Sequence, residues 1–246
     1  MFTIFKRFCP VKEKILSVKL YTNMHIDSLQ ETALDEKCIL VDKFDRPIGK
    51  ATKKHCHQIA KDGYIPLHRA FSVFLFNSNG DLLIQKRSAT KITFPSYYTN
   101  TCCSHPLAEI DGESEEMNAL GIRRAAQRRL CYELGIPLIE VQLQDFCYLT
   151  RIHYHATDDE IWGEHEIDYV LFLQLNRVTL NPNPNEVSEI QWISKEHMNN
   201  FVKNIKFPLT PWFKLILEHQ LPLWWNNLNV LHKFQNHSTI HRFSKL

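Results

Sequence analysis

The chain of 246 residues has no long hydrophobic run, little net charge and no regular cysteine framework. No apolar stretch approaches the roughly 20 residues that a membrane-spanning helix needs, so we expect no membrane span. The formal net charge is only +2, which gives no argument for nucleic acid as a partner. The seven cysteines are odd in number and no clear secretory signal accompanies them, so we expect free thiols in a reducing compartment.

Hydrophobic residues make up 44% of the chain and aromatic residues 11%, which is enough for a packed core and argues against wholesale disorder. The length suits one large domain, or one domain with terminal extensions. The first 35 residues show neither strand alternation nor a clean helical stripe. We interpret residues 1–35 as a flexible extension, with a weak targeting segment and an added helix as the alternatives.

The pattern after residue 35 predicts an α+β domain with a mixed sheet. Strands are expected at 38–41, 146–156, 165–175 and 189–193, and a hairpin is expected from 70–76 and 82–87. The main helix is expected at 114–134, with Ser114 as its N-cap and Gly135 as its end. Further helices are expected at 194–203, from Thr210 and Pro211 onward, and at 223–234.

Two dense runs of reactive side chains stand out. TNTCCSHPL at 99–107 places a thiol two residues from an imidazole, and WGEHE at 162–166 adds two carboxylates in a strand-like segment. Glu164 and Glu166 are two apart on that strand and therefore project from one face. Together these runs offer a proton donor, a proton acceptor and ligands for a metal ion.

A third run, RRLCYELGI at 128–136, resembles a degraded Nudix box, the helical signature of enzymes that act on nucleoside diphosphates linked to another group. The full box carries several metal-binding glutamates. Here Arg129 and Tyr132 stand where glutamates would be expected, and only Glu133 remains. Arg129 and Glu133 are four apart and share one helix face, so a simple surface ion pair is the alternative interpretation.

The three runs, taken together with several shorter motifs, resemble those of type I isopentenyl-diphosphate delta-isomerases of the eukaryotic kind. The resemblance runs from about residue 38 to 242 and includes the segments 52–54, 67–73, 87–95, 100–107, 123–137, 161–169 and 210–212. It implies a Nudix-like α/β/α sandwich over residues 36–243, with a mixed sheet and extra terminal elements. It also implies interconversion of isopentenyl and dimethylallyl diphosphate in isoprenoid, and hence sterol, biosynthesis.

The resemblance assigns a proton-transfer pair to Cys103 and Glu166. Glu166 would protonate the terminal alkene carbon and the Cys103 thiolate would take a proton from the carbon nearer the diphosphate; the opposite assignment stays open because the reaction is reversible. An unactivated alkene is a poor base, so two separate groups are needed. Tyr154 matches a phenol beside the glutamate, and Trp212 matches an indole that faces the carbocation.

The resemblance also implies two metal sites and an anion site. The first metal site would hold Mg²⁺, Mn²⁺ or Zn²⁺, and its ligands would be His57, His68, His105, Glu164 and Glu166. At the second, Glu133 would hold a Mg²⁺ ion that bridges the diphosphate. The side chains that match substrate-binding positions are Lys53, Arg87, Lys91, Ser104 and Arg129.

Two other functional classes remain open, a Nudix-type diphosphate hydrolase and a non-catalytic binding module. The last three residues, Ser244, Lys245 and Leu246, match a peroxisomal address that is read by an import receptor. We therefore expect a peroxisomal protein with a cytosolic pool, in preference to a mitochondrial one. The expected partners are a small diphosphate substrate and that receptor, and we expect a monomer.

Overall fold

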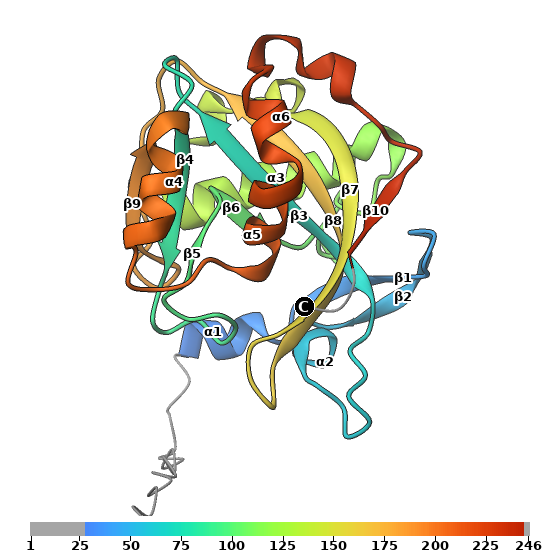
Figure 1. Ribbon diagram of the computed structural model, residues 1–246. Coiled ribbons are helices and arrows are strands. Elements are labelled where there is room, and N and C mark those ends of the chain that lie inside the picture. Colours follow the sequence, from blue (N-terminus) through green and yellow to red (C-terminus); the bar gives the residue numbers. More distant parts are fainter. Residues whose placement is uncertain (1–27, 244–246) are drawn as a thin grey trace, which may run out of the picture.

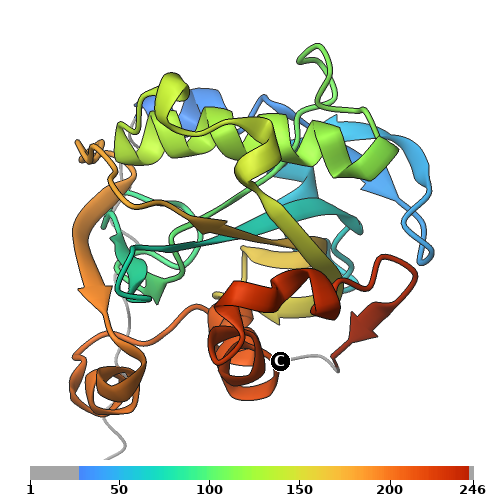
Figure 2. The same ribbon diagram turned by 90° about the horizontal axis from the view of Figure 1, so that it is seen from above.

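A mixed β-sheet lies between two layers of helices in the computed structural model, which describes residues 28–243 (Figures 1 and 2). The main path of this ten-stranded sheet runs in the order β10, β7, β8, β3, β1 and β2. These strands are β1 (Lys37–Val41), β2 (Pro47–Thr52), β3 (His68–Phe76), β7 (Cys147–Thr157), β8 (Gly163–Gln174) and β10 (Ile240–Arg242). The remaining strands are β4 (Leu82–Arg87), β5 (Tyr98–Thr99), β6 (Cys102–Ser104) and β9 (Val187–Ile193). The expected α+β fold with a mixed sheet is confirmed.

The parallel pair β3 and β8 forms the centre of the sheet. All nine residues of β3 are buried, as expected for a strand with helices on both sides. Phe71 and Val73 belong to the core under one helical layer, whereas Phe74 and Phe76 belong to the core under the other. The register pairs His68 with Glu166, so this pairing alone brings together an imidazole and a carboxylate that lie 98 residues apart in the chain.

Helix α3 (Leu120–Leu134) covers one face of the sheet through side chains such as Ile122 and Leu130 (Figure 2). Gly135 ends it as expected, with a φ of 65°. The expected start at Ser114 is wrong, because Asn118 and Ala119 take left-handed backbone angles. Both residues belong to a short 3₁₀ segment, η1 (Met117–Ala119), and α3 begins only after it.

The opposite face carries α4 (Lys195–Asn204), α5 (Pro211–His219) and α6 (Leu221–Trp225), drawn in orange to red in Figure 2. The expected helices after Ser194 and Thr210 are confirmed. The expected helix at 223–234 is instead divided into α6 and the 3₁₀ segment η4 (Leu228–Phe234). The other short helices are α1 (Ser28–Ala33), α2 (Lys53–His57), η2 (Leu138–Glu140) and η3 (Leu143–Asp145).

The expected hairpin of β3 and β4 is only partly formed, and its opening builds the site. The chain reverses at the expected turn, but only Phe76 and Leu82 pair between β3 and β4; the other partners of β4 are β9 and the short strand β5. The Thr101 hydroxyl lies between the two strands, accepting a hydrogen bond from Leu75 N (2.8 Å) and donating one to Leu83 O (2.6 Å). Segment 98–104 is thereby inserted between β3 and β4, with β6 paired to β3 and β5 paired to β4.

Helix α1 lies within the segment expected to be an extension, and its Gln30 is buried. Gln30 hydrogen-bonds to Asn185 O and to the Glu186 carboxylate, so the folded part of the chain reaches at least to residue 28. Residues 1–27 and 244–246 lie outside the described residues. They include most of the expected N-terminal extension and all of the expected C-terminal signal. Among the described residues, no helix is both long and apolar enough to cross a membrane.

Candidate active site

One pocket collects the side chains that the sequence singled out. It lies where α1, α2, β6 and α5 meet the ends of the central strands. Every expected site residue lines this pocket except His68, which is fully buried, and Glu133. Those that line it are Lys53, His57, Arg87, Lys91, Cys103, Ser104, His105, Arg129, Tyr154, Glu164, Glu166 and Trp212.

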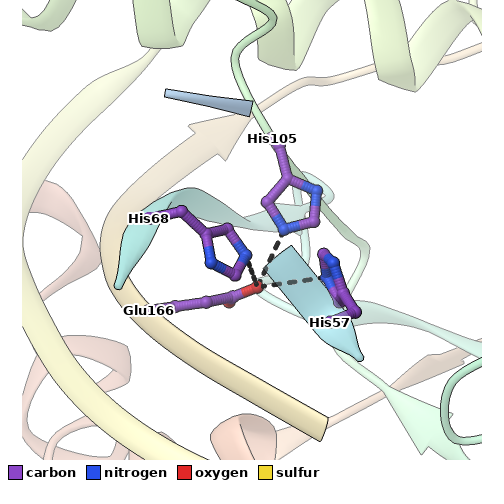
Figure 3. A group of neighbouring side chains, drawn as sticks. All are labelled: His57, His68, His105 and Glu166. Atoms are coloured by element: carbon purple, nitrogen blue, oxygen red, sulfur yellow. Dashed lines mark hydrogen bonds and ion pairs between the residues drawn. The ribbon is translucent and has the colours of Figure 1, made fainter. Parts of the chain in front are cut away.

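Three imidazoles converge on one carboxylate oxygen in this pocket (Figure 3). The distances from Glu166 Oε1 are 2.8 Å to Nε2 of His105, 3.3 Å to Nε2 of His68 and 3.8 Å to Nε2 of His57. All four side chains are buried, and one potential ligand atom from each lies within 4.8 Å of the others. The residues come from α2, β3, β8 and the loop after β6, so only the folded chain assembles them.

Hydrogen bonds at the other ring nitrogens orient two of these imidazoles. Nδ1 of His57 lies 2.8 Å from Lys53 O, and Nδ1 of His68 lies 2.9 Å from Pro66 O. Each Nδ1 therefore carries the proton and donates to a carbonyl, which leaves the Nε2 lone pair directed at Glu166. Among residues 28–243, the fully buried Nε2 of His68 has no hydrogen-bond partner besides its 3.3 Å contact with Glu166 Oε1. Nitrogen lone pairs gathered around an anionic oxygen are complementary to a divalent cation.

The protonation equilibria follow from this crowding. Burial and the neighbouring imidazoles lower the pKa of His57 well below its usual value, and burial lowers the pKa of His105 to about 4. Burial also disfavours the charged form of His68, but the hydrogen bond and charge of Glu166 outweigh it and raise that pKa to about 9. Burial would raise the pKa of Glu166, yet its bonds to His105 and His68 hold it well below the usual range. Neutral imidazole and ionised carboxylate are the forms that bind metals, so His57, His105 and Glu166 are ready to bind, whereas His68 would release a proton when a metal ion binds.

Glu164 lies beside this group of four ligands and not within it. The Tyr154 hydroxyl joins the two carboxylates, at 2.6 Å from Glu166 Oε2 and 2.9 Å from Glu164 Oε2. Burial and the charge of Glu166 raise the pKa of Glu164 to about 8. Tyr154 thus contacts Glu166, the glutamate beside which the family resemblance predicts a phenol.

The two adjacent cysteines face opposite sides of β6. Cys102 is fully buried in the core under α3, whereas Cys103 lines the pocket. Cys103 Sγ lies 2.9 Å from Asn100 Oδ1, 3.4 Å from Ser72 Oγ and 2.9 Å from Nε1 of Trp212, which donates to it. Burial and the charge of Asp168 raise the pKa of the Cys103 thiol.

The basic side chains gather at another part of the pocket. Lys91 Nζ lies 2.5 Å from Glu186 Oε2, and burial lowers the pKa of Lys91 to about 8. The Arg87 guanidinium donates to the carbonyls of residues 93 and 94 and lies 5.8 Å from the Trp212 ring centroid. These buried cations, with Lys53 beside them, make the pocket suited to an anion.

Arg129 and Glu133 do share a helix face, but their ion pair is buried, so the surface interpretation is wrong. Arg129 Nη2 lies 2.7 Å from Glu133 Oε1, and Gln85 Nε2 donates to the other oxygen at 3.1 Å. Both side chains are at most 8% exposed. Glu133 has no place in the pocket lining, and its carboxylate is occupied by Arg129 and Gln85.

Sequence reasoning attached no role to four further polar residues. Asn100 contacts both Cys103 and Trp212; Ser72 donates to Asp168 at 2.7 Å; and Glu186 binds Lys91. Ser72 and Asp168 each interrupt an apolar run, 70–76 in β3 and 167–173 in β8, which is a signal that could have identified them. Glu186 carries no comparable signal, because the stretch around it reads as an ordinary loop.

Comparisons with known proteins agree with this geometry. The NUDIX domain pattern matches residues 66–213. "Isopentenyl-diphosphate Delta-isomerase 1" of Mesocricetus auratus is 54% identical over 221 residues, covering 89% of this chain and 96% of that protein. "Isopentenyl-diphosphate Delta-isomerase" of Dictyostelium discoideum is 45% identical over 223 residues, covering 88% and 93%.

Solved structures support the fold at greater evolutionary distance. A Deinococcus radiodurans protein superposes with a TM-score of 0.52 at 19% identity, covering 75% of this chain and 99% of that one. A NUDIX hydrolase from Alicyclobacillus acidocaldarius gives 0.51 at 9% identity, covering 68% and 96%. At such low identity these likenesses concern the fold alone.

Proposed function

This chain belongs to the family of isopentenyl-diphosphate Delta-isomerases, and on that premise we propose that it converts isopentenyl diphosphate to dimethylallyl diphosphate and back. The 54% identity to the rodent isomerases over nearly their whole length is the observation that carries the assignment. The chain is an isomerase of the NUDIX fold, and its pocket offers side chains for proton transfer, for metal binding and for holding a diphosphate.

Cys103 and Glu166 are the proposed proton-transfer pair. Glu166 donates a proton to the terminal alkene carbon, which becomes a methyl group and leaves a tertiary carbocation. The Cys103 thiolate then removes a proton from the carbon next to the diphosphate-bearing carbon, and the new double bond forms there. In the reverse reaction the two roles exchange. The opposite assignment, in which the Cys103 thiol donates and the Glu166 carboxylate accepts, corresponds to the lowered pKa of Glu166 and the raised pKa of Cys103 in the substrate-free site. Glu166 is buried, Cys103 is half-buried, and each has its own hydrogen-bond partners, which supports this proposal because both transfers need a site shielded from water.

Trp212 and Tyr154 are the proposed partners of the carbocation and the acid. The indole of Trp212 is 2% exposed and its N–H is held by Cys103 and Asn100, so the ring lies fixed beside the thiol. An aromatic face stabilises a cation without acting as a nucleophile. Tyr154 holds the orientation of Glu166 through its 2.6 Å hydrogen bond.

His57, His68, His105 and Glu166 are proposed to hold a divalent metal ion, with Glu164 next to them. The mixed nitrogen and oxygen donor set fits zinc or manganese as readily as magnesium. The buried Nε2 of His68, which has no partner among the described residues besides the Glu166 carboxylate, supports an ion there. Such an ion, when bound, supplies positive charge that stabilises the ionised carboxylate in a buried place. Glu133 stays the proposed holder of a substrate-bridging Mg²⁺ ion, a role that would require its carboxylate to exchange Arg129 or Gln85 for the ion.

The diphosphate is proposed to bind the basic side of the pocket. Its charge is matched by Lys53, Arg87, Lys91 and Arg129, and the Ser104 hydroxyl is able to donate to the same oxygens.

The purified protein should be incubated with isopentenyl diphosphate and Mg²⁺, and the products analysed for the acid-labile allylic isomer and for inorganic phosphate. Allylic isomer without phosphate supports the proposal. Phosphate release without isomer would instead favour a Nudix-type hydrolase.

We also propose a peroxisomal destination with a cytosolic pool, on the basis of Ser244, Lys245 and Leu246, which lie outside the described residues. The test is a fluorescent tag at the N-terminus of a chain that ends at Leu246, compared in cells with the same protein lacking 244–246. Loss of punctate peroxisomal signal on deletion is expected. An unchanged distribution would reject the address.

A further inference from the structure

Glu186 lies at the end of the loop that precedes β9, and its buried carboxylate contacts the basic side of the pocket. Its Oε2 is 2.5 Å from Lys91 Nζ and 3.3 Å from Arg129 Nη2. Its Oε1 accepts a hydrogen bond from Gln30 Nε2 of α1 at 3.2 Å. One carboxylate therefore joins two cations that come from the loop after β4 and from α3.

The backbone around Glu186 is tied to the same two elements. The Glu186 carbonyl accepts a hydrogen bond from Ser88 N at 2.9 Å, and Ser88 begins the loop that carries Lys91. Asn183 N donates to Glu133 O near the end of α3, and Asn183 O accepts from Glu186 N, each at 2.9 Å. These bonds hold the carboxylate at a set place relative to both cations.

The charges around Lys91 explain why a carboxylate is needed there. Arg87 of β4 and Lys53 of α2 carry the same sign as Lys91, whereas Glu186 and, more weakly, Glu133 of α3 oppose them. Burial together with the two like charges lowers the pKa of Lys91 to about 8 even with Glu186 present. Lys91 and Arg129 in turn hold the pKa of Glu186 at about 2 against the effect of its burial, so it stays ionised at neutral pH.

We propose that Glu186 is a positioning residue for the diphosphate: it aims the ammonium of Lys91 and the guanidinium of Arg129 at the pocket and keeps Lys91 charged there. This inference rests on the proposed function, since it assumes a diphosphate substrate. A carboxylate so close to the cations also competes with the incoming anion. The two effects have opposite signs, so removal of the charge tells them apart.

The test compares wild type, Glu186→Gln and the matched control Glu189→Gln. Glu189 lies in β9 three residues further on; it accepts a hydrogen bond from the Tyr98 hydroxyl and is absent from the pocket lining. Binding of inorganic pyrophosphate with Mg²⁺ is measured by calorimetry between pH 6.5 and 9. Wild type should lose affinity as the pH rises through about 8. In Glu186→Gln the midpoint of this loss of affinity should lie at least about one pH unit lower, and pyrophosphate should bind at least about fivefold more weakly at pH 7.5. The control should match wild type.

Steady-state kinetics with isopentenyl diphosphate provide the second readout: KM should rise in Glu186→Gln with a smaller change in kcat. Equal or tighter pyrophosphate binding by a folded Glu186→Gln variant overturns the proposal. Glu186→Asp keeps the charge and shortens the reach, so it should bind more weakly while retaining the wild-type pH midpoint. A shifted midpoint in that variant also counts against the proposal. A wild-type protein that binds pyrophosphate as expected but forms no allylic product would reject the isomerase function and leave the role of Glu186 intact.

Discussion

The indole nitrogen of Trp212 donates a hydrogen bond to the sulfur of Cys103 across 2.9 Å, although 109 residues separate the two along the chain. The same N–H lies 3.1 Å from Asn100 Oδ1, so the half-buried thiol of Cys103 and the buried amide and indole form one hydrogen-bonded cluster. Donation to sulfur favours the thiolate over the thiol. Through this contact, a residue of α5 affects the reactivity of the Cys103 thiol, which lies on β6.

Replacement of Cys103 by alanine should lower kcat by at least about 10²–10⁴-fold, because it removes a group that transfers a proton. Cys102→Ala is the matched control, since Cys102 lies next in sequence but faces the core under α3. Its effect should be mainly on stability. The assay is isomer formation from isopentenyl diphosphate with both variants checked for folding. Similar turnover in the two variants would contradict the assigned role of Cys103.

Trp212→Phe should retain an aromatic ring and lose only the N–H donor to Cys103. A hydrogen bond to a charged group is worth about 1.5–3 kcal/mol, so kcat should fall about 10- to 100-fold. The alkylation rate of Cys103 as a function of pH is a separate measure, obtained as the difference from Cys103→Ala. Its midpoint should move to higher pH in Trp212→Phe. An unmoved midpoint would show that the indole does not tune the thiol.

The purified protein should retain about one divalent ion per chain after dialysis, as measured by elemental mass spectrometry. His68→Ala should lose that ion, because the fully buried Nε2 of His68 faces Glu166 Oε1 at 3.3 Å. His197→Ala is the control, since His197 is exposed on α4 and pairs with Ser194. Equal metal content in both variants would argue against the proposed ligands.

The ion pair of Glu186 should make stability depend on pH. Its pKa falls from 4.5 to about 2 beside Lys91 and Arg129, so it stabilises the fold above pH 4.5 and loses that effect as the pH falls toward 2. Glu186→Gln should therefore reduce the free energy of unfolding by about 3 kcal/mol near pH 7 and by progressively less below pH 4.5. Urea unfolding at several pH values measures the difference. A deficit that is constant down to about pH 2.5 would indicate that lost packing, and not charge, is the cause.

Much of the fold and of the site is encoded locally. Strand alternation placed β1, β7, β8 and β9 close to their observed bounds, and Gly135 marked the end of α3, because backbone periodicity and left-handed turns depend on nearby residues. The motifs around Cys103 and Glu166 suffice to identify the family, since relatives share those runs of residues. The start of α3 was misplaced because a caplike Ser114 carries no information about the left-handed turn at residues 118 and 119.

Only the tertiary structure decided which edges and charges meet. The turn at 77–81 reverses the chain, but Thr101 enters between β3 and β4, and β4 pairs with β9 instead. Glu186 reaches Lys91 across 95 residues, and Glu133 is taken up by Arg129 and Gln85 away from the pocket lining. Local sequence determines turns and periodicity, whereas the partners of a strand edge or of a buried charge depend on what the completed packing brings within hydrogen-bonding distance.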